Sequence, residues 1–434
     1  MTKIIIIGAG PAGTAASLKA AEAGWETVLV EKDKLGGTCL QRGCIPTKAL
    51  LEESHIVKQA RSNFGLGDVN EVEIHRRKQQ IVDELTQSLT RQINAKKITV
   101  LPGEARFVDE QSIVVDDTIH TADYFLIATG SRDRVFDFPG NAKLWLSEDA
   151  LTTPLQSNRN LLLIGGGVIG IELAAYYNDL GHRVTILEKE ARILPGAPKE
   201  LSQSIATDFK KEGIRIITGV NIHSITQNLD YEVAFNDTVE HFDHVLLCAG
   251  RVPNTSTLGF EDIGLAHTSG LITIDENYRT NLPKIFAVGD ASCRVQLAHV
   301  ATRQAIDVME YLIHGKNPQP FFTPFVIYTP VQAAWIGAAE AQLIANQTEY
   351  RSIRQPLGAL AKQKIKSDGR RYVSLLVDPS NHILGVSLYM SEAGEFLPFF
   401  GLLMEMKIPL DQAKNLVFPH PTLSEAIGEI AANL

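Results

Sequence analysis

The sequence predicts an α/β protein with two Rossmann-like dinucleotide-binding units followed by a C-terminal domain of mixed α+β structure. Residues 4–31 and residues 161–188 repeat one pattern, in which a glycine-rich turn joins an apolar run to an Ala-rich segment. After the Pro-rich stretch 317–320 the composition changes to β-branched runs and one apolar helix. A length of 434 residues allows about three domains.

The composition is that of a soluble globular protein, with 44% hydrophobic and 21% charged residues. The net charge of −9 forces no basic surface, so we expect neither a nucleic-acid partner nor an anionic membrane surface. The longest strongly apolar stretch, residues 396–404, is far shorter than the ~20 residues of a membrane span. The apolar run before Gly8 is too short for a signal peptide. We therefore expect no membrane span and a cytoplasmic location.

Each copy of the repeat has the parts of a nucleotide-binding unit. A strand is predicted over residues 4–7 and over 161–164, a helix follows to about residue 23 or 180, and a second strand ends in Glu31 or Glu188. The turns follow the pattern G-x-G-x-x-G, with Gly8, Gly10 and Gly13 in the first copy and Gly165, Gly167 and Gly170 in the second. Glycines let the backbone approach a pyrophosphate at the helix N-terminus, and the Glu can accept from a ribose hydroxyl. The double occurrence favours binding over two strand–helix units without a ligand.

Three further apolar strands end on glycine, over residues 125–130, 245–250 and 285–290, and the third carries a carboxylate, Asp290. Between residues 54 and 97 the chain is polar with a helical spacing of apolar residues, which predicts one amphipathic helix. Its apolar stripe is expected at Ile81, Leu85, Leu89 and Ile93.

Cys39 and Cys44 lie a few residues after the first unit, and one helical turn could bring both sulfurs together. A zinc site would need a second ligand pair, whereas Cys248 and Cys293 are solitary, so no metal is expected. Inert core thiols fit poorly with the polar surroundings. A redox-active disulfide beside a flavin or nicotinamide is favoured, because two dinucleotide units supply an electron source. Nearby positive charge and a helix N-terminus would lower a thiol pKa below about 8.5.

Thiol exchange also needs a proton acceptor, and histidine suits that task at neutral pH. His420 is the strongest candidate, with Glu425 five residues on as an orienting carboxylate. The alternative is a surface histidine beside a helix N-cap at Thr422 or Ser424.

Segment 36–48, both glycine turns, residues 128–130, 287–291 and 420–425 together resemble the class I pyridine nucleotide-disulfide oxidoreductases over essentially the whole chain. Within that group, segments 36–51 and 297–301 are most similar to the dihydrolipoyl dehydrogenases. A departure is Arg132-Asp133 after Ser131, where the family usually has a proline.

The resemblance implies FAD and NAD as cofactors and assigns roles to single residues. Glu31 would bind the FAD ribose, Lys48 would lie near the flavin and Asp290 on its ribityl-phosphate arm. Cys44 would face the flavin and Cys39 would exchange with substrate. Glu172 would pair with Lys48 beside the nicotinamide, and His420 with Glu425 would reach across a dimer interface into the partner's site. Further cofactor contacts are expected at Thr38, Gly130, Ala298 and Gly250.

The resulting prediction divides the chain into a first part of the FAD-binding domain (1–147), an NAD-binding domain (148–268), a return segment of the FAD-binding domain (269–316) and an interface or dimerisation domain (317–434). The predicted activity is of dihydrolipoyl dehydrogenase type, moving electrons from a dihydrolipoyl dithiol through the Cys39–Cys44 disulfide and FAD to NAD. Expected partners are a second copy of the chain and a free or protein-bound lipoyl group, with a 2-oxo acid dehydrogenase or related complex as a possible parent assembly. The alternatives are an NAD(P)H-dependent reductase of a small disulfide or metal ion, and a redox-sensing flavoprotein of low turnover.

Overall fold

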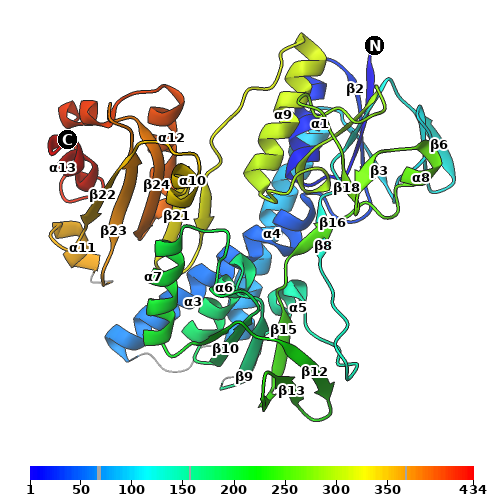
Figure 1. The fold of residues 1–434 in the computed structure, drawn as a ribbon. Coiled ribbons are helices and arrows are strands. Elements are labelled where there is room, and N and C mark those ends of the chain that lie inside the picture. The colour runs from blue at the N-terminus through cyan, green and yellow to red at the C-terminus, as the bar shows by residue number, and fades with distance from the viewer. Residues whose placement is uncertain (66–69, 156–157, 367–368) are drawn as a thin grey trace.

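The computed structural model spans residues 1–434 and describes all of them except 66–69, 156–157 and 367–368 (Figure 1). The first unit is built on a five-stranded parallel sheet, which confirms the strands predicted at residues 4–7 and 125–130. The strands, in spatial order, are β19 (Ile285–Ala287), β7 (Tyr124–Ile127), β1 (Lys3–Ile7), β2 (Glu26–Glu31) and β3 (Thr99–Pro102). Helices α1 (Pro11–Glu22) and α9 (Ala298–His314) pack side by side against it (Figure 1).

The second unit repeats this plan with a four-stranded parallel sheet. Its strands are β11 (Arg215–Thr218), β10 (Arg183–Glu188), β9 (Asn160–Ile164) and β15 (His244–Leu247). Helix α6 (Val168–Asp179) follows the glycine turn, and α7 (Lys199–Lys211) lies between this unit and the C-terminal sheet. The two copies of the sequence repeat therefore form two copies of one fold.

Each parallel sheet carries a small antiparallel sheet of three strands. These are β4 (Arg106–Asp109), β5 (Ser112–Val115) and β6 (Thr118–Thr121) in the first unit, and β12 (Ile222–Gln227), β13 (Tyr231–Phe235) and β14 (Thr238–Phe242) in the second. The chain passes between the units through β8 (Ser131–Asp133) and β16 (Arg251–Pro253), which pair antiparallel. Shorter elements are α5 (Ser147–Thr152), α8 (Phe260–Ile263), β17 (His267–Thr268), β18 (Leu271–Ile272) and the 3-10 turn η1 (Gly289–Ala291).

The C-terminal domain follows an irregular stretch that contains the predicted linker 317–320. Its five-stranded antiparallel sheet has the order β20 (Phe325–Ile327), β21 (Gln332–Gly337), β24 (Ile383–Met390), β23 (Tyr372–Val377) and β22 (Arg351–Pro356). The predicted apolar helix is α12 (Ala393–Glu405), which packs on β21 and β24. The remaining helices are α10 (Glu340–Ala345), α11 (Ala361–Lys366), η2 (Leu410–Asn415) and α13 (Glu425–Ala432). The predicted fold class is thus confirmed.

The single amphipathic helix predicted between residues 54 and 97 is wrong in its limits, and one of the four residues of its predicted apolar stripe is exposed while Ile93 is fully buried. The structure has α3 (Cys44–Phe64) and α4 (Glu71–Ala95) there. Leu85, placed in the predicted apolar stripe, is 42% exposed, whereas Glu71 is buried. The Glu71 carboxylate bonds His182 Nε2 at 2.7 Å. The face of α4 was misjudged because it buries polar groups that find partners in the second unit.

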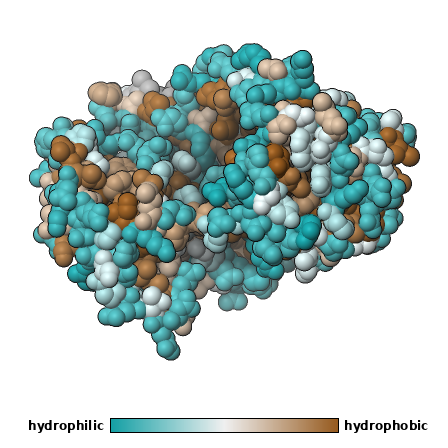
Figure 2. All heavy atoms as spheres, turned by 90° about the horizontal axis from the view of Figure 1, so that it is seen from above, coloured by the Kyte–Doolittle hydropathy of each residue, from teal (hydrophilic) through white to brown (hydrophobic). Residues whose placement is uncertain are grey.

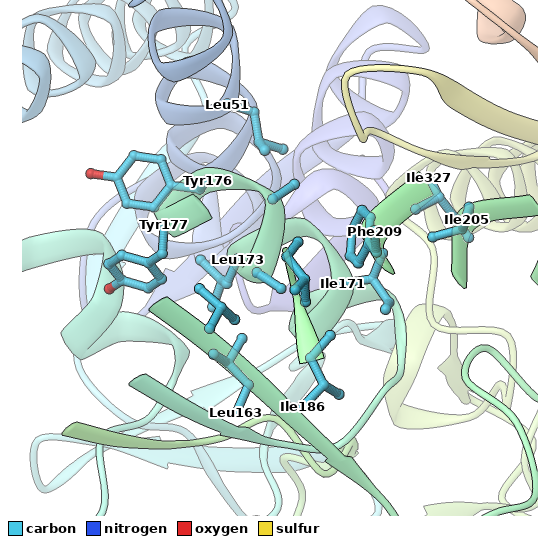
Figure 3. Packing of buried hydrophobic residues seen from close by; sticks show 14 of the residues in the cluster. Leu51, Leu163, Ile171, Leu173, Tyr176, Tyr177, Ile186, Ile205, Phe209 and Ile327 are labelled. Atoms are coloured by element: carbon cyan, nitrogen blue, oxygen red, sulfur yellow. The ribbon is translucent and has the colours of Figure 1, made fainter. Parts of the chain in front are cut away.

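One hydrophobic cluster connects α3, the second unit and the C-terminal domain (Figure 3). Leu51 of α3 and Tyr176 of α6 belong to it, together with Ile327 of β20. This shared core fixes α3, which begins at Cys44, against α6. Among the described residues, no helix combines the length and apolar character needed to cross a bilayer.

Candidate active site at the Cys39–Cys44 pair

The two glycine turns are held by equivalent hydrogen bonds, each set made by the Glu that ends the second strand of its unit. Glu31 accepts the backbone N–H of Ala9 at 2.8 Å and of Asp33 at 2.9 Å. In the second unit, Glu188 accepts the N–H groups of Gly166 at 2.6 Å and Glu190 at 2.8 Å. Each carboxylate therefore lies against its own glycine turn, where its remaining lone pairs can meet a ribose.

The glycines of each turn have two different reasons to be glycine. A Cβ on Gly13 would lie 1.8 Å from the carbonyl oxygen of Gly8, and one on Gly170 would lie 2.0 Å from that of Gly165, so the fold itself excludes side chains there. Gly10 and Gly167 have φ values of −71° and −76°, open to any residue, and a Cβ would meet no protein atom within 4 Å. The chain's own packing does not require glycine at these two positions. The open cradle at each helix N-terminus fits the pyrophosphate of a dinucleotide.

The two cysteines lie on different helices. Cys39 is in α2 (Gly37–Arg42) and Cys44 opens α3, with Gly43 between the helices at φ −142° and ψ −114°. The expectation that one helical turn joins the sulfurs is therefore wrong, because the backbone leaves the helical region at Gly43. Both cysteines are free thiols in this structure, and their side chains nevertheless form a hydrogen bond with each other.

The two thiols are electrostatically unequal. The hydrogen bond from Cys39, together with the positive charge of Lys48, lowers the pKa of Cys44 to about 7 against the opposing effect of burial. The same hydrogen bond, burial and the charge on Cys44 raise the pKa of Cys39. Of the two thiols, Cys44 therefore ionises first, with its midpoint near neutral pH, and Cys39 keeps its proton.

Lys48 lies one helical turn after Cys44 and reaches the second unit. Its Nζ donates to Glu172 Oε2 of α6 at 2.7 Å, and Glu172 is 2% exposed. Burial alone would lower the pKa of Lys48, but the charge and hydrogen bond of Glu172 raise it. The predicted Lys48–Glu172 pair is thus present, and it keeps an ammonium group beside the Cys44 sulfur.

Tyr328, which the sequence did not single out, completes this group. Its backbone N–H donates to Glu172 Oε1 at 3.0 Å, and Lys48 Nζ lies 4.8 Å from the centre of its ring. Tyr328 follows β20, so the C-terminal domain of the same chain contacts the pair. Tyr328 lies 156 positions from Glu172, so no local sequence pattern could indicate this contact.

The predicted His420–Glu425 pair is also present. His420 Nδ1 bonds Glu425 Oε1 at 2.8 Å, and the N–H of Thr422 donates to Glu425 Oε2 at 2.8 Å. These two bonds lower the pKa of Glu425. The imidazole is largely exposed, and Ser424 is the N-cap of α13, as the alternative interpretation expected. Among the described residues, no hydrogen bond or ion pair links His420 to the cysteines of its own chain.

Large apolar side chains are exposed on the C-terminal domain, which also carries His420. On the face drawn in Figure 2, hydrophobic atoms gather over the C-terminal lobe. The exposed large apolar residues of this region are Leu402, Met406, Leu416 and Val417. Exposed apolar surface of this kind usually marks an interface.

Other predicted cofactor residues lie at the ends of strands or in the first turns of helices. The Asp290 charge contributes to raising the pKa of Cys39, which places η1 near α2. Thr38 lies in α2 next to Cys39, and Ala298 is the first residue of α9. Gly130 and Gly250 follow the strands β7 and β15 and have φ values of +70° and +93°.

Arg192 lies four residues after Glu188, which contacts the second glycine turn. Its guanidinium donates to the carbonyls of Leu194, Pro195 and Ala197. Its guanidinium is therefore engaged by its own loop.

Two dinucleotide cradles and a thiol pair between them define a disulfide oxidoreductase that works with a pyridine nucleotide. The chain belongs to the pyridine nucleotide-disulphide oxidoreductase family: the family model matches residues 2–305. The model of the family's dimerisation domain matches residues 323–431. Members of this family use FAD and NAD(P).

Relatives and solved structures of this class match over nearly the whole chain. Dihydrolipoyl dehydrogenase from Buchnera aphidicola is 32% identical, covering 98% of this chain and 94% of that protein. The enzyme of that name from Bacillus subtilis is 31% identical, covering 99% and 97%. The structure of the HOCl-induced flavoprotein disulfide reductase RclA from Escherichia coli is similar with a TM-score of 0.91 and 25% identity, covering 99% of both chains. LpdA from Mycobacterium tuberculosis has the same fold, with a TM-score of 0.92.

Proposed function

We propose that this protein is an NAD-dependent dihydrolipoyl dehydrogenase, which oxidises a dihydrolipoyl dithiol. The observation that carries the proposal is the unequal thiol pair, with a pKa of about 7 at Cys44 and a raised pKa at Cys39. This inequality suits a site in which Cys39 exchanges with substrate and Cys44 holds the thiolate. Relatives of that name at 31–32% identity over the full length support the substrate class.

The proposed thiol–disulfide exchange passes through a mixed disulfide between the substrate and Cys39. A substrate thiolate attacks Sγ of Cys39 in the oxidised pair; the Cys39–Cys44 bond breaks, a substrate–Cys39 disulfide forms, and Cys44 leaves as a thiolate. The second substrate sulfur then attacks the first, the lipoyl disulfide closes, and Cys39 leaves. His420, oriented by Glu425, takes the proton released from the substrate thiol. Lys48 stabilises the thiolate that remains on Cys44.

When bound, FAD accepts the electron pair held by the two sulfurs and NAD is the final acceptor. The residues proposed to hold FAD are Gly8, Gly10, Gly13, Glu31, Thr38, Gly130, Asp290 and Ala298, with Lys48 beside the flavin. Those proposed to hold NAD are Gly165, Gly167, Gly170, Glu188 and Gly250, with Glu172 beside the nicotinamide. The corresponding division is 1–147 and 269–316 for FAD, 148–268 for NAD, and 317–434 for the interface.

A homodimer forms part of the proposal. The match to the dimerisation domain and the exposed apolar residues of the C-terminal domain support it. In such a dimer, His420 of one chain serves the cysteines of the other, which accounts for the lack, among the described residues, of a bond from His420 to the cysteines of its own chain. A protein-bound lipoyl group, and with it a 2-oxo acid dehydrogenase or related complex, is the proposed physiological partner.

Steady-state assays test the proposal against its main alternative, a reductase that runs from NAD(P)H to a small disulfide or a metal ion. The similarity to RclA is the observation that favours the alternative. Dihydrolipoamide with NAD should give turnover in the usual enzyme range of about 1–1000 per second. Faster turnover of NADPH with glutathione disulfide, Hg(II) or Cu(II) would support the reductase instead. Turnover below about 0.1 per second with every pair would indicate a redox-sensing flavoprotein.

A further inference from the structure

The chain crosses between its two cofactor units through a ribbon of two short strands. β8 follows Gly130 and leads into the second unit, while β16 follows Gly250 and leads back (Figure 1). Their antiparallel register places Arg251 opposite Asp133. An ion pair at this position therefore bridges the outgoing and the returning connection.

Arg251 ties the two strands together with three hydrogen bonds. Its Nη1 donates to Asp133 Oδ1 at 2.5 Å, its Nε to Ser131 Oγ at 2.8 Å, and its Nη2 to the Ser131 carbonyl at 2.7 Å. The Arg251 and Asp133 side chains are only 17% and 16% exposed. Asp133 also accepts the hydroxyl of Ser147, the first residue of α5, at 2.9 Å. The contacts thus extend from the ribbon into the second unit.

The same contacts extend in the other direction to Asp290. Ser131 Oγ donates to Asp290 Oδ2 at 2.6 Å. A hydroxyl has a single proton, and because Arg251 donates into Ser131 Oγ, that proton is directed at Asp290. Asp133, which orients Arg251, stands where the family resemblance leads one to expect proline, and a proline could not supply this carboxylate.

We propose that Arg251, held by Asp133, is a positioning residue of the FAD site: it keeps the Ser131 hydroxyl donating to Asp290 and so keeps Asp290 available to FAD as a carboxylate. The inference rests on the proposed role of Asp290 in FAD binding. It makes the junction of the two units part of the flavin site, with Arg251 acting on Asp290 through the Ser131 hydroxyl.

The electrostatics give this arrangement a pH signature. Among the described residues, the charged or titratable groups that interact with Asp290 include Arg251 from β16 and Cys39 from α2. Burial raises the pKa of Asp290, and the Ser131 hydrogen bond and the Arg251 charge oppose the rise. Removing Arg251 leaves burial less opposed, so Asp290 should protonate at a higher pH. FAD retention that needs the carboxylate is then lost earlier as the pH falls.

The test is FAD release from the purified holoenzyme, followed by flavin fluorescence between pH 8 and pH 5. Arg251→Met should move the midpoint of release to a higher pH than that of the wild type, because the Arg251 charge opposes the effect of burial on the Asp290 pKa. Asp133→Asn should move it in the same direction by less. The matched control is Arg132→Met, which removes an exposed charge from the same strand and should leave the midpoint unchanged.

Ser131→Ala provides a second test, because it removes a single hydroxyl and decides the matter if Arg251→Met does not fold. It should reproduce the upward shift, and adding it to Arg251→Met should cause little further change. Unshifted midpoints in Arg251→Met and Ser131→Ala, or FAD loss that is equal at every pH, would overturn the proposal. Asp290→Asn tests the role of Asp290 in FAD binding separately from the role of Arg251. If this variant holds FAD as the wild type does, the proposed role of Asp290 fails.

Discussion

Replacing Cys39 by serine and by alanine should report how much this thiol does for Cys44. The hydrogen bond from Cys39 is the largest effect on the Cys44 pKa of about 7. A serine hydroxyl still donates, so in Cys39→Ser the Cys44 thiol should ionise near the same pH. Alanine removes the donor altogether, and burial is then opposed by the Lys48 charge and a backbone hydrogen bond, without the Cys39 hydrogen bond.

The size of the difference follows from the charge of the acceptor. A hydrogen bond to a charged group contributes about 1.5–3 kcal/mol, and one pKa unit corresponds to about 1.36 kcal/mol. The Cys44 pKa in Cys39→Ala should therefore rise by roughly one to two units. Because the group ionises by losing a proton, the thiolate is present above each midpoint and absent below it.

The measurement is the long-wavelength absorbance that a thiolate beside oxidised FAD produces, recorded against pH in the holoenzyme. Cys39→Ser should show the band with a midpoint near pH 7, and Cys39→Ala should show it only at higher pH. Cys44→Ser should lack the band, because Cys44 is the sulfur proposed to face the flavin and burial still raises the pKa of Cys39. Cys293→Ser is the control and should behave as the wild type. A band in Cys44→Ser but not in Cys39→Ser would reverse the assignment, and equal midpoints in the serine and alanine variants would refute the role of the hydrogen bond.

Three other predictions concern the cofactors and the acid–base pair. Because Glu188 is proposed to bond a ribose 2′-hydroxyl, its carboxylate would repel a 2′-phosphate, so kcat/KM should be higher for NADH than for NADPH, and the opposite order would contradict it. His420→Ala should lower turnover roughly 10²–10⁴-fold while FAD stays bound, and mixing it with Cys39→Ser should restore activity in heterodimers; a fully active monomer would exclude a shared site. Gly10→Ala should leave the melting temperature unchanged or slightly higher but weaken FAD binding, and Gly167→Ala should raise KM for NAD with FAD retained. An unchanged FAD affinity in Gly10→Ala would mean that no ligand occupies that cradle.

The sequence by itself was enough for the features that depend on local spacing. The two glycine turns and their terminal carboxylates could be predicted because a strand, a tight turn and a helix follow one another within thirty residues. Close pairs such as His420 with Glu425 were also within reach, since five residues separate them. In each case, neighbours along the chain are neighbours in space.

Only the tertiary structure decided the contacts between distant segments. Lys48 meets Glu172 across 124 positions, and Tyr328 meets the same carboxylate across 156; the first pairing was expected from family resemblance alone, and the second was not expected. The buried polar face of α4 was missed because apolar periodicity cannot indicate a charged residue whose partner lies in another unit. The Arg251–Asp133 pair was invisible for the same reason. Such contacts are set by how packed elements meet, and a one-dimensional pattern carries no information on which partner each polar group will find.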